Sequence, residues 1–116
     1  MPATILIAED QLINLWLLCL FLEAQGYQVL RARNGTEALQ LAESYDGAID
    51  LLLTDICMPE MDGYRLAAEF RKKRPEAKIM FITAQPRHPL PSDIPVVLKP
   101  FDPEDLLAAV RQVLAG

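Results

Sequence analysis

The apolar run Leu-Leu-Leu-Thr at residues 51–54 constrains the fold of this chain more than any other segment. Asp50 precedes the run and Asp55 follows it. The segment after Asp55 is broken by Pro59 and Gly63. A continuous apolar stretch of this length is typical of a strand buried on both faces, as in parallel sheets. Asp55 would then lie at the carboxyl edge of the sheet, where open α/β sheets bind their ligands. Taken alone, Asp55 could equally cap a helix or a turn.

Polar residues also end three further short runs that are rich in apolar and β-branched residues. In a parallel sheet these residues would lie at the same edge as Asp55. The cluster would combine three carboxylates, one hydroxyl and one ammonium group. The residues are Glu9 and Asp10 after residues 4–8, Thr83 after residues 78–82, and Lys99 after residues 96–98.

The charges of this cluster predict a metal site. Three carboxylates within a few ångströms repel one another, so the arrangement persists only if a cation offsets the repulsion. Oxygen ligands of this kind suit Mg²⁺, which needs few protein ligands and keeps waters free for phosphate oxygens. The metal would hold a phosphoryl group against the Asp55 carboxylate, a known type of nucleophile in phosphoryl transfer. Lys99 and the Thr83 hydroxyl would donate to the phosphoryl oxygens.

Strand and helix patterns alternate along the chain, and its 116 residues predict one domain over residues 1–116. The alternation predicts an α/β fold with a five-stranded, doubly wound parallel sheet. The expected strands are Thr4–Ala8, Gln28–Ala32, Asp50–Thr54, Lys78–Ile82 and Val96–Leu98. The expected helices are Leu12–Gln25, Gly35–Ser44, Gly63–Lys73 and Pro103–Leu114.

From Ile5 to the end of the last helix, the chain resembles the receiver domain of two-component response regulators. That family has a flavodoxin-like fold, the fold of the chemotaxis regulators. A single acidic pair would be a weak signal, whereas the full set of markers in register is specific. The markers are Glu9-Asp10, Asp55, Pro59, Gly63, Thr83-Ala84 and Lys99-Pro100-Phe101.

The resemblance implies a role for each residue at the carboxyl edge. Asp55 is expected to be the phosphoacceptor, which takes a phosphoryl group from a phosphohistidine of a sensor histidine kinase or histidine phosphotransfer protein. Glu9 and Asp10 are expected to form the acidic Mg²⁺ pocket with Asp55, and the backbone carbonyl of Cys57 is expected to be a further ligand. Such a domain is not an enzyme acting on a separate substrate; it catalyses its own phosphorylation and dephosphorylation, and it signals through changed protein contacts.

The resemblance also implies a switch. Thr83 is expected to move toward the phosphoryl group, Lys99 to pair with it, and the Lys99–Pro100 bond to be cis, which costs little before proline. Asn14 is expected beside the active site as a positioning residue.

The segment between Thr83 and Lys99 departs from the family. It is short and contains four prolines, so the helix that the family normally has here is expected to be missing or reduced to a turn. Val96 stands where the family often has a switching aromatic residue, which puts the usual output mechanism in doubt. His88 in this segment is interpreted as a solvated side chain.

The helix expected at residues 12–25 is apolar nearly all round, where a surface helix should have a polar face. One side carries Leu15, Trp16, Cys19 and Leu20, and the other carries Leu17, Leu18, Phe21 and Leu22. We expect one side to pack on the sheet and the side with Leu15, Trp16 and Leu20 to bind a kinase, a phosphotransfer protein or a second copy. The alternative is a helix partly covered by the last helix.

Composition limits the other function classes. The net charge of −5 argues against direct nucleic-acid binding, and the basic run at residues 71–74 is interpreted as offsetting a helix dipole. No apolar run reaches the ~20 residues of a membrane span, and two cysteines without a leader predict reduced thiols. We therefore expect a cytoplasmic bacterial protein, and a stand-alone receiver.

Two rival functions remain. An aspartyl-nucleophile phosphatase usually needs a second acid two residues past the nucleophile, where this chain has Cys57. A phosphorylation-independent interaction module would fit the altered switch elements, but the full acidic pocket and Lys99 disfavour it.

Overall fold

The computed structural model describes residues 2–84 and 93–116. It confirms the expected five-stranded parallel sheet, whose strand order is β2-β1-β3-β4-β5. Two strands extend one residue further than expected, so Asp55 and Thr83 are the last residues of their strands rather than the first residues beyond them. The strands are β1 (Thr4–Ala8), β2 (Gln28–Ala32), β3 (Leu51–Asp55), β4 (Lys78–Thr83) and β5 (Val96–Leu98).

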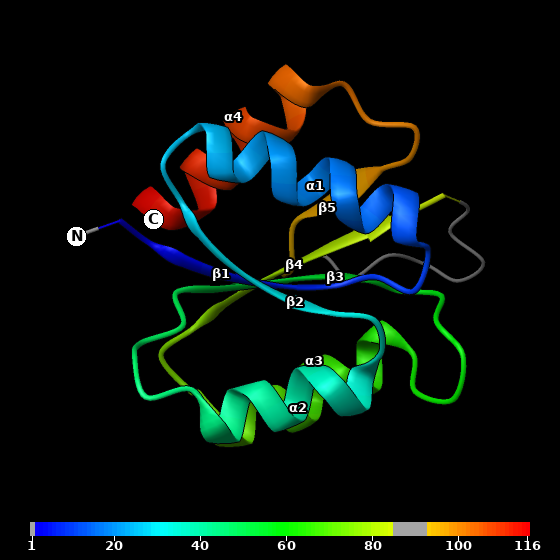
Figure 1. Ribbon diagram of the computed structural model, residues 1–116, viewed down its shortest axis with the longest axis vertical. Helices are drawn as coiled ribbons and strands as arrows, with labels where there is room; N and C mark the ends of the chain where they lie inside the picture. The colour runs from blue at the N-terminus through cyan, green and yellow to red at the C-terminus, as the bar shows by residue number, and fades with distance from the viewer. Residues whose placement is uncertain (1, 85–92) are drawn as a thin grey trace.

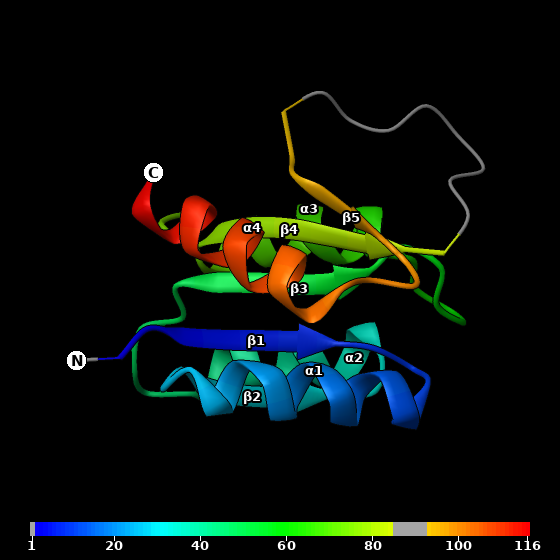
Figure 2. The same cartoon turned by 90° about the horizontal axis from the view of Figure 1, so that it is seen from above.

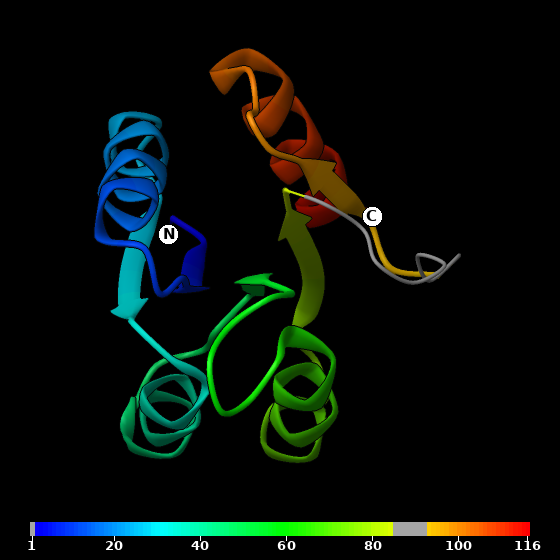
Figure 3. The ribbon, with the colours of Figure 1, turned by 90° about the vertical axis from the view of Figure 1, so that its right-hand side faces the viewer.

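Four helices cover the two faces of the sheet in the described residues (Figure 1). Helices α1 and α4 lie on one face and helices α2 and α3 on the other, as the end-on view in Figure 3 shows. This is the doubly wound arrangement that the alternation of strands and helices predicts. The helices are α1 (Leu12–Ala24), α2 (Gly35–Ser44), α3 (Gly63–Lys73) and α4 (Pro103–Ala115).

The family normally has a helix between β4 and β5, and in this chain that helix was expected to be missing or reduced to a turn. In Figure 2, β5 forms the edge of the sheet beside β4, and the chain that joins them runs mostly through residues 85–92. These residues, which include His88, lie outside the described part of the chain. In the described residues on either side, 84 and 93–95, there is no helix.

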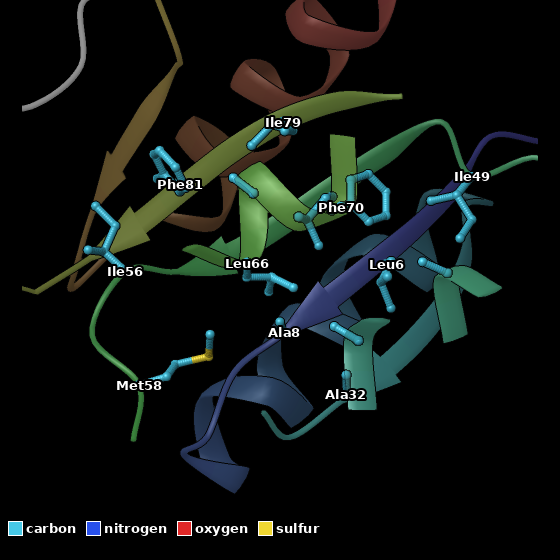
Figure 4. Packing of buried hydrophobic residues seen from close by; sticks show 14 residues of the cluster. Leu6, Ala8, Ala32, Ile49, Ile56, Met58, Leu66, Phe70, Ile79 and Phe81 are labelled. Atoms are coloured by element: carbon cyan, nitrogen blue, oxygen red, sulfur yellow. The ribbon is translucent and has the colours of Figure 1, made fainter. Parts of the chain in front are cut away.

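Side-chain alternation along the strands builds two cores, one on each face of the sheet. Leu6 and Ala8 of β1 face α2 and α3, where they pack with Phe70 and other buried residues (Figure 4). Ile5 and Ile7 face α1 and α4. Because β1, β3 and most of β4 are buried on both faces, their positions at the carboxyl edge are fixed by packing on either side.

The orientation of helix α1 on the sheet differs from the prediction. Leu15 was expected on the partner-binding side, but it is buried against the sheet together with Leu18, Cys19 and Leu22. These four positions follow the i, i+3, i+4, i+7 spacing of a single helical stripe. Trp16 and Leu20 are exposed, as expected. The predicted division of the helix was therefore wrong for Leu15 and Cys19, which belong to the core, and for Leu17, which was expected on the sheet side but is exposed.

The basic run at residues 71–74 is part of the fold. Its first three residues lie in the last turn of α3, as the dipole interpretation predicts. The Arg74 guanidinium donates hydrogen bonds to the backbone carbonyls of Ala42, Tyr45 and Gly47, which ties the end of α3 to the last turn of α2 and the segment that follows it. No helix in the described residues is long and apolar enough to cross a membrane.

Gly63 allows α3 to begin directly against the end of β3. Its N–H donates to the Ile56 carbonyl at 2.8 Å. A Cβ atom on Gly63 would press into the Asp55 carbonyl oxygen and lie 2.8 Å from the Ile56 Cα atom. Both neighbours are backbone atoms of the segment that presents the Asp55 side chain, so neither can move without displacing it.

Gly63→Ala is therefore expected to lower the free energy of unfolding by about 1–3 kcal/mol, the usual cost of overpacking. Urea denaturation would measure this loss. Gly35→Ala is the matched control, because Gly35 is also the first residue of its helix but would meet only the flexible Met61 side chain. Equal losses in the two variants would contradict a special role for the close approach at Gly63.

Candidate functional site

Three carboxylates meet at the carboxyl edge of the sheet, as the sequence predicts. Each of Glu9, Asp10 and Asp55 places a carboxylate oxygen within 4.8 Å of the others. Asp55 is the last residue of β3, and Glu9 and Asp10 directly follow β1, which is its neighbour in the sheet. Glu9 is completely buried and Asp55 nearly so. This edge of the sheet faces the viewer in Figure 3.

Lys99 supplies a cation to this cluster. Its Nζ atom donates to Asp55 Oδ2 at 2.8 Å and to Glu9 Oε1 at 2.9 Å. The Lys99 N–H donates to the Thr83 carbonyl at 2.8 Å, which anchors the residue next to β4. The Lys99–Pro100 peptide bond is cis, as expected. One ammonium group faces three carboxylates, so the cluster keeps a negative charge.

Glu9 has an unusual environment for a carboxylate. Its Oε1 atom accepts from Lys99 and from the Asn14 side chain, which lies beside the site as predicted. Its Oε2 atom is buried without a hydrogen-bond partner in the described residues. Burial, followed by the neighbouring Asp55 carboxylate, raises the pKa of Glu9 to about 7, although Lys99 acts in the opposite direction.

Lys99 is held in its charged form by the same contacts. Burial alone would lower the pKa of the Lys99 ammonium group, but its hydrogen bonds to Asp55 and Glu9 outweigh burial and raise it. The ammonium group therefore remains charged wherever the two carboxylates are ionised.

The Asp55 carboxylate is oriented from both sides. Its Oδ1 atom accepts from the Cys57 backbone N–H at 3.1 Å, and its Oδ2 atom accepts from Lys99. The Cys57 side chain is exposed. The expected role of the Cys57 carbonyl as a metal ligand stays a prediction. The orientation of the Asp55 carboxylate is therefore fixed at both of its oxygens.

Thr83 is the last residue of β4, and its carbonyl accepts a hydrogen bond from the Lys99 N–H just past β5. It is buried, and its hydroxyl has no hydrogen-bond partner in the described residues. A buried hydroxyl without a partner is costly, and it often marks a place where a further group binds. The expected movement of Thr83 stays a prediction.

Val96, at the position where the family often has a switching aromatic residue, pairs with Phe81 of β4 and is half-buried.

The donor set fits a hard divalent cation. Carboxylate oxygens from three residues converge, Glu9 has one oxygen that is buried without a partner in the described residues, and the cluster keeps a net negative charge. Mg²⁺ prefers such oxygen ligands and completes its shell with water. Glu9, Asp10 and Asp55 are therefore the residues that would hold it.

A groove leads along α1 to this site. Its volume is about 400 Å³ and its surface is largely apolar. The Phe21 and Phe101 rings meet edge to face, with centroids 6.3 Å apart, and join α1 to the segment before α4. Sequence reasoning did not find this groove, because its walls come from distant segments. The lining residues are Gln11, Asn14, Leu17, Phe21, Ala84, Lys99, Pro100, Phe101 and Pro103.

The sequence matches the response regulator receiver domain family over residues 5–111, which span both the acidic cluster and Lys99. The chain belongs to this family. Receiver domains are signalling domains of two-component systems rather than classical enzymes, and they typically bind Mg²⁺. The resemblance drawn from the sequence markers is thus confirmed, as is the flavodoxin-like receiver fold.

Individual relatives support the same assignment. The response regulator receiver protein CpdR of Brucella abortus (strain 2308) is 39% identical over 116 residues, covering 95% of each chain. The sensor kinase CckA of the same organism is 32% identical, covering 97% of this chain and 12% of CckA. A crystal structure of the receiver domain from the hybrid histidine kinase CckA superposes with a TM-score of 0.86 at 36% identity, covering 97% of this chain and 99% of that domain. This receiver thus resembles both a CpdR-type protein and a domain of a much larger kinase.

Proposed function

We propose that this receiver accepts a phosphoryl group on Asp55 from a phosphohistidine and signals through changed protein contacts. The observation that carries the proposal is the buried Asp55 carboxylate, held between the Cys57 N–H and Lys99 beside two further carboxylates. A carboxylate oxygen of Asp55 attacks phosphorus, the phosphorus–nitrogen bond to the donor imidazole breaks, and an acyl phosphate forms. The donor imidazole keeps the electron pair of that bond.

The surrounding residues would stabilise this transfer. Glu9, Asp10 and Asp55 are the residues that would hold a Mg²⁺ ion, which would supply positive charge to the phosphoryl oxygens. Lys99 already lies 2.8 Å from Asp55 Oδ2 and can pair with a phosphoryl oxygen after transfer. The Thr83 hydroxyl is a further donor without a present partner. These two groups give the protein a way to distinguish the phosphorylated form from the free form.

The groove beside the site is a route for the donor. A phosphohistidine on a sensor kinase or phosphotransfer protein must bring its imidazole next to Asp55. The groove is bordered by Asn14, which hydrogen-bonds to Glu9, and by Lys99. Its apolar walls suit a helix of such a partner. The relatives support this class of partner, because one of them is a sensor kinase.

The rival functions have less support. An aspartyl-nucleophile phosphatase usually needs a second carboxylic acid two residues past the nucleophile, where this chain has Cys57. A module that works without phosphorylation has no need for a buried lysine paired with two carboxylates, which is costly to desolvate.

Acetyl phosphate with Mg²⁺ tests the proposal directly. Intact-mass measurement is expected to show the addition of one phosphoryl group, and a chelator should prevent the addition. Asp10→Asn is expected to slow it at least tenfold, because the metal pocket loses a charged ligand. Asp46→Asn is the control, since Asp46 is exposed and lies in the loop between α2 and β3, outside the acidic cluster. Unchanged labelling in the chelator and in Asp10→Asn would contradict a metal-dependent receiver.

A further inference from the structure

The outward side of α1 carries a continuous apolar surface, which we call the outer α1 face. Its members are Leu12, Ile13, Trp16, Leu17 and Leu20, with exposed fractions of 59%, 76%, 76%, 39% and 62%. Trp16 stands at its centre. Leu98 on β5 is the one other large apolar side chain that is exposed in the described residues. Exposed apolar surface is thus concentrated on this one helix.

The outer α1 face is large for the surface of a monomer. Its five side chains together expose on the order of 600–700 Å² of apolar surface, compared with ~800 Å² that each partner contributes to a standard interface. Apolar patches of this size on soluble proteins mark interaction sites. Asn14 is the one polar residue between Leu12 and Leu22, so the face carries no charge over three helical turns.

A groove lies beside the side chains of the outer α1 face. The groove has a volume of about 370 Å³, enough to receive a large side chain. At its rim, Arg31 of β2 and Glu23 at the end of α1 form an ion pair at 3.1 Å, and both remain about half exposed. The groove is lined by Ile13, Trp16, Leu17, Cys19, Leu20, Glu23 and Arg31.

We propose that the outer α1 face binds a second copy of this chain in a two-fold symmetric dimer, in which the two α1 helices cross antiparallel near Trp16. Such a dimer requires one patch that is complementary to itself. The outer α1 face and the adjacent groove meet this requirement. Each copy offers protruding side chains around Trp16 and a groove that can receive those of the other copy. An antiparallel crossing at Trp16 places Ile13 of one copy near Leu20 of the other.

Charge favours a second copy over a charged partner. The chain has a net charge of −5, so two copies repel each other at most surfaces. The outer α1 face has no charge at its centre, and its rim carries one residue of each sign, Glu23 and Arg31. In a symmetric dimer these rim residues can pair across the interface. A strongly basic or acidic partner would find no complementary charge on the face itself.

The dimer leaves most of the route to Asp55 open. The groove beside the outer α1 face and the groove that leads to Lys99 share Leu17 alone among their lining residues. A second copy and a phosphohistidine donor would therefore contact largely different sides of α1. The dimer does not depend on phosphorylation, and it can be tested on the unphosphorylated protein.

Sedimentation and fluorescence would test the dimer together. Trp16 is the only tryptophan in the chain, so its emission reports directly on the centre of the proposed interface. The wild type is expected to sediment as a dimer at high micromolar concentration, and dilution should shift Trp16 emission to the red as the ring becomes exposed. Leu20→Glu is expected to sediment as a monomer, with emission that does not change on dilution.

Two further variants complete the test. Ile13→Lys should also give a monomer, so the result does not rest on the folding of one variant. Leu98→Glu is the control, because it places the same charge at a similarly exposed leucine on β5 and should leave the dimer intact. A wild type that stays monomeric, or a dimer that persists in both α1 variants, would overturn the proposal. A monomer that binds a phosphotransfer protein through Trp16 would also overturn it, and would assign the face to that partner.

Discussion

Asp55→Asn is expected to abolish phosphorylation by acetyl phosphate. The amide that replaces the carboxylate is not a nucleophile toward phosphorus. The amide oxygen can still accept from the Cys57 N–H, so the local structure should persist although the charged contact with Lys99 is lost. Intact mass after incubation with Mg²⁺ measures the loss. A thermal melt of the variant would confirm that it is folded.

Hydroxylamine provides the chemical control for this experiment. The label on the wild type should be removed by hydroxylamine, because an acyl phosphate is cleaved by this nucleophile whereas a phosphate ester on serine or threonine is not. Glu9 and Asp10 are the nearest other carboxylates. Labelling of Asp55→Asn that remains sensitive to hydroxylamine would move the acceptor to one of these two residues, and the proposed role of Asp55 would be abandoned.

The acidic cluster could be predicted from the sequence because it depends on a simple property of parallel sheets. Strands that are buried on both faces have a recognisable composition, and their carboxyl ends meet at one edge. Once the apolar runs before Glu9, Asp55 and Lys99 are taken as strands, the three side chains are brought together without further information. In the structure, the Lys99 ammonium group donates hydrogen bonds to both the Glu9 and the Asp55 carboxylates.

The orientation of α1 could not be predicted in the same way. Where apolar residues surround a helix almost completely, hydropathy does not distinguish the side that packs on the sheet from the side that faces outward. Leu15 and Trp16 are neighbours in sequence and both apolar, yet one is buried and the other is exposed. The angular position of the helix is fixed by its contacts with the strands and α4, which the sequence of α1 does not contain.

Long-range packing also hid the importance of two residues. Gly63 was recognised as a marker, but its close contact with the Asp55 backbone depends on how α3 docks against the sheet. The complete burial of Glu9, with one oxygen left without a partner, likewise depends on how Lys99 and Asn14 reach it from other elements. Neither feature leaves a local pattern in the sequence.

Lys99→Met is expected to destabilise the metal-free protein strongly at pH 8. Methionine has nearly the length of lysine but no charge, so it leaves the Glu9 and Asp55 carboxylates buried without their cation. Removal of one partner from a buried ion pair costs about 3–5 kcal/mol, because the remaining charge is uncompensated. Urea denaturation in the presence of a chelator would measure the change in the free energy of unfolding.

The size of this loss should depend on pH through Glu9. The pKa of Glu9 is about 7 in the folded protein, against an ordinary value of 4.5, so between these values the folded protein binds more protons than the unfolded chain. Stability therefore rises as the pH falls through this range. Without Lys99, which acts to lower the pKa of Glu9, protonation becomes easier still, so Lys99→Met should lose less stability at pH 6 than at pH 8.

Lys72→Met is the matched control for Lys99→Met. Its side chain is 72% exposed and forms only a surface ion pair with Glu69 at 3.4 Å, which contributes about 0–1 kcal/mol. The double variant Glu9→Gln with Lys99→Met should recover part of the stability at pH 8, because one of the two uncompensated carboxylates becomes neutral. A loss in Lys99→Met that is equal at pH 6 and pH 8, and not reduced by Glu9→Gln, would show that Glu9 is not the group that titrates. Lys99 would then stabilise the fold through its packing rather than through its charge.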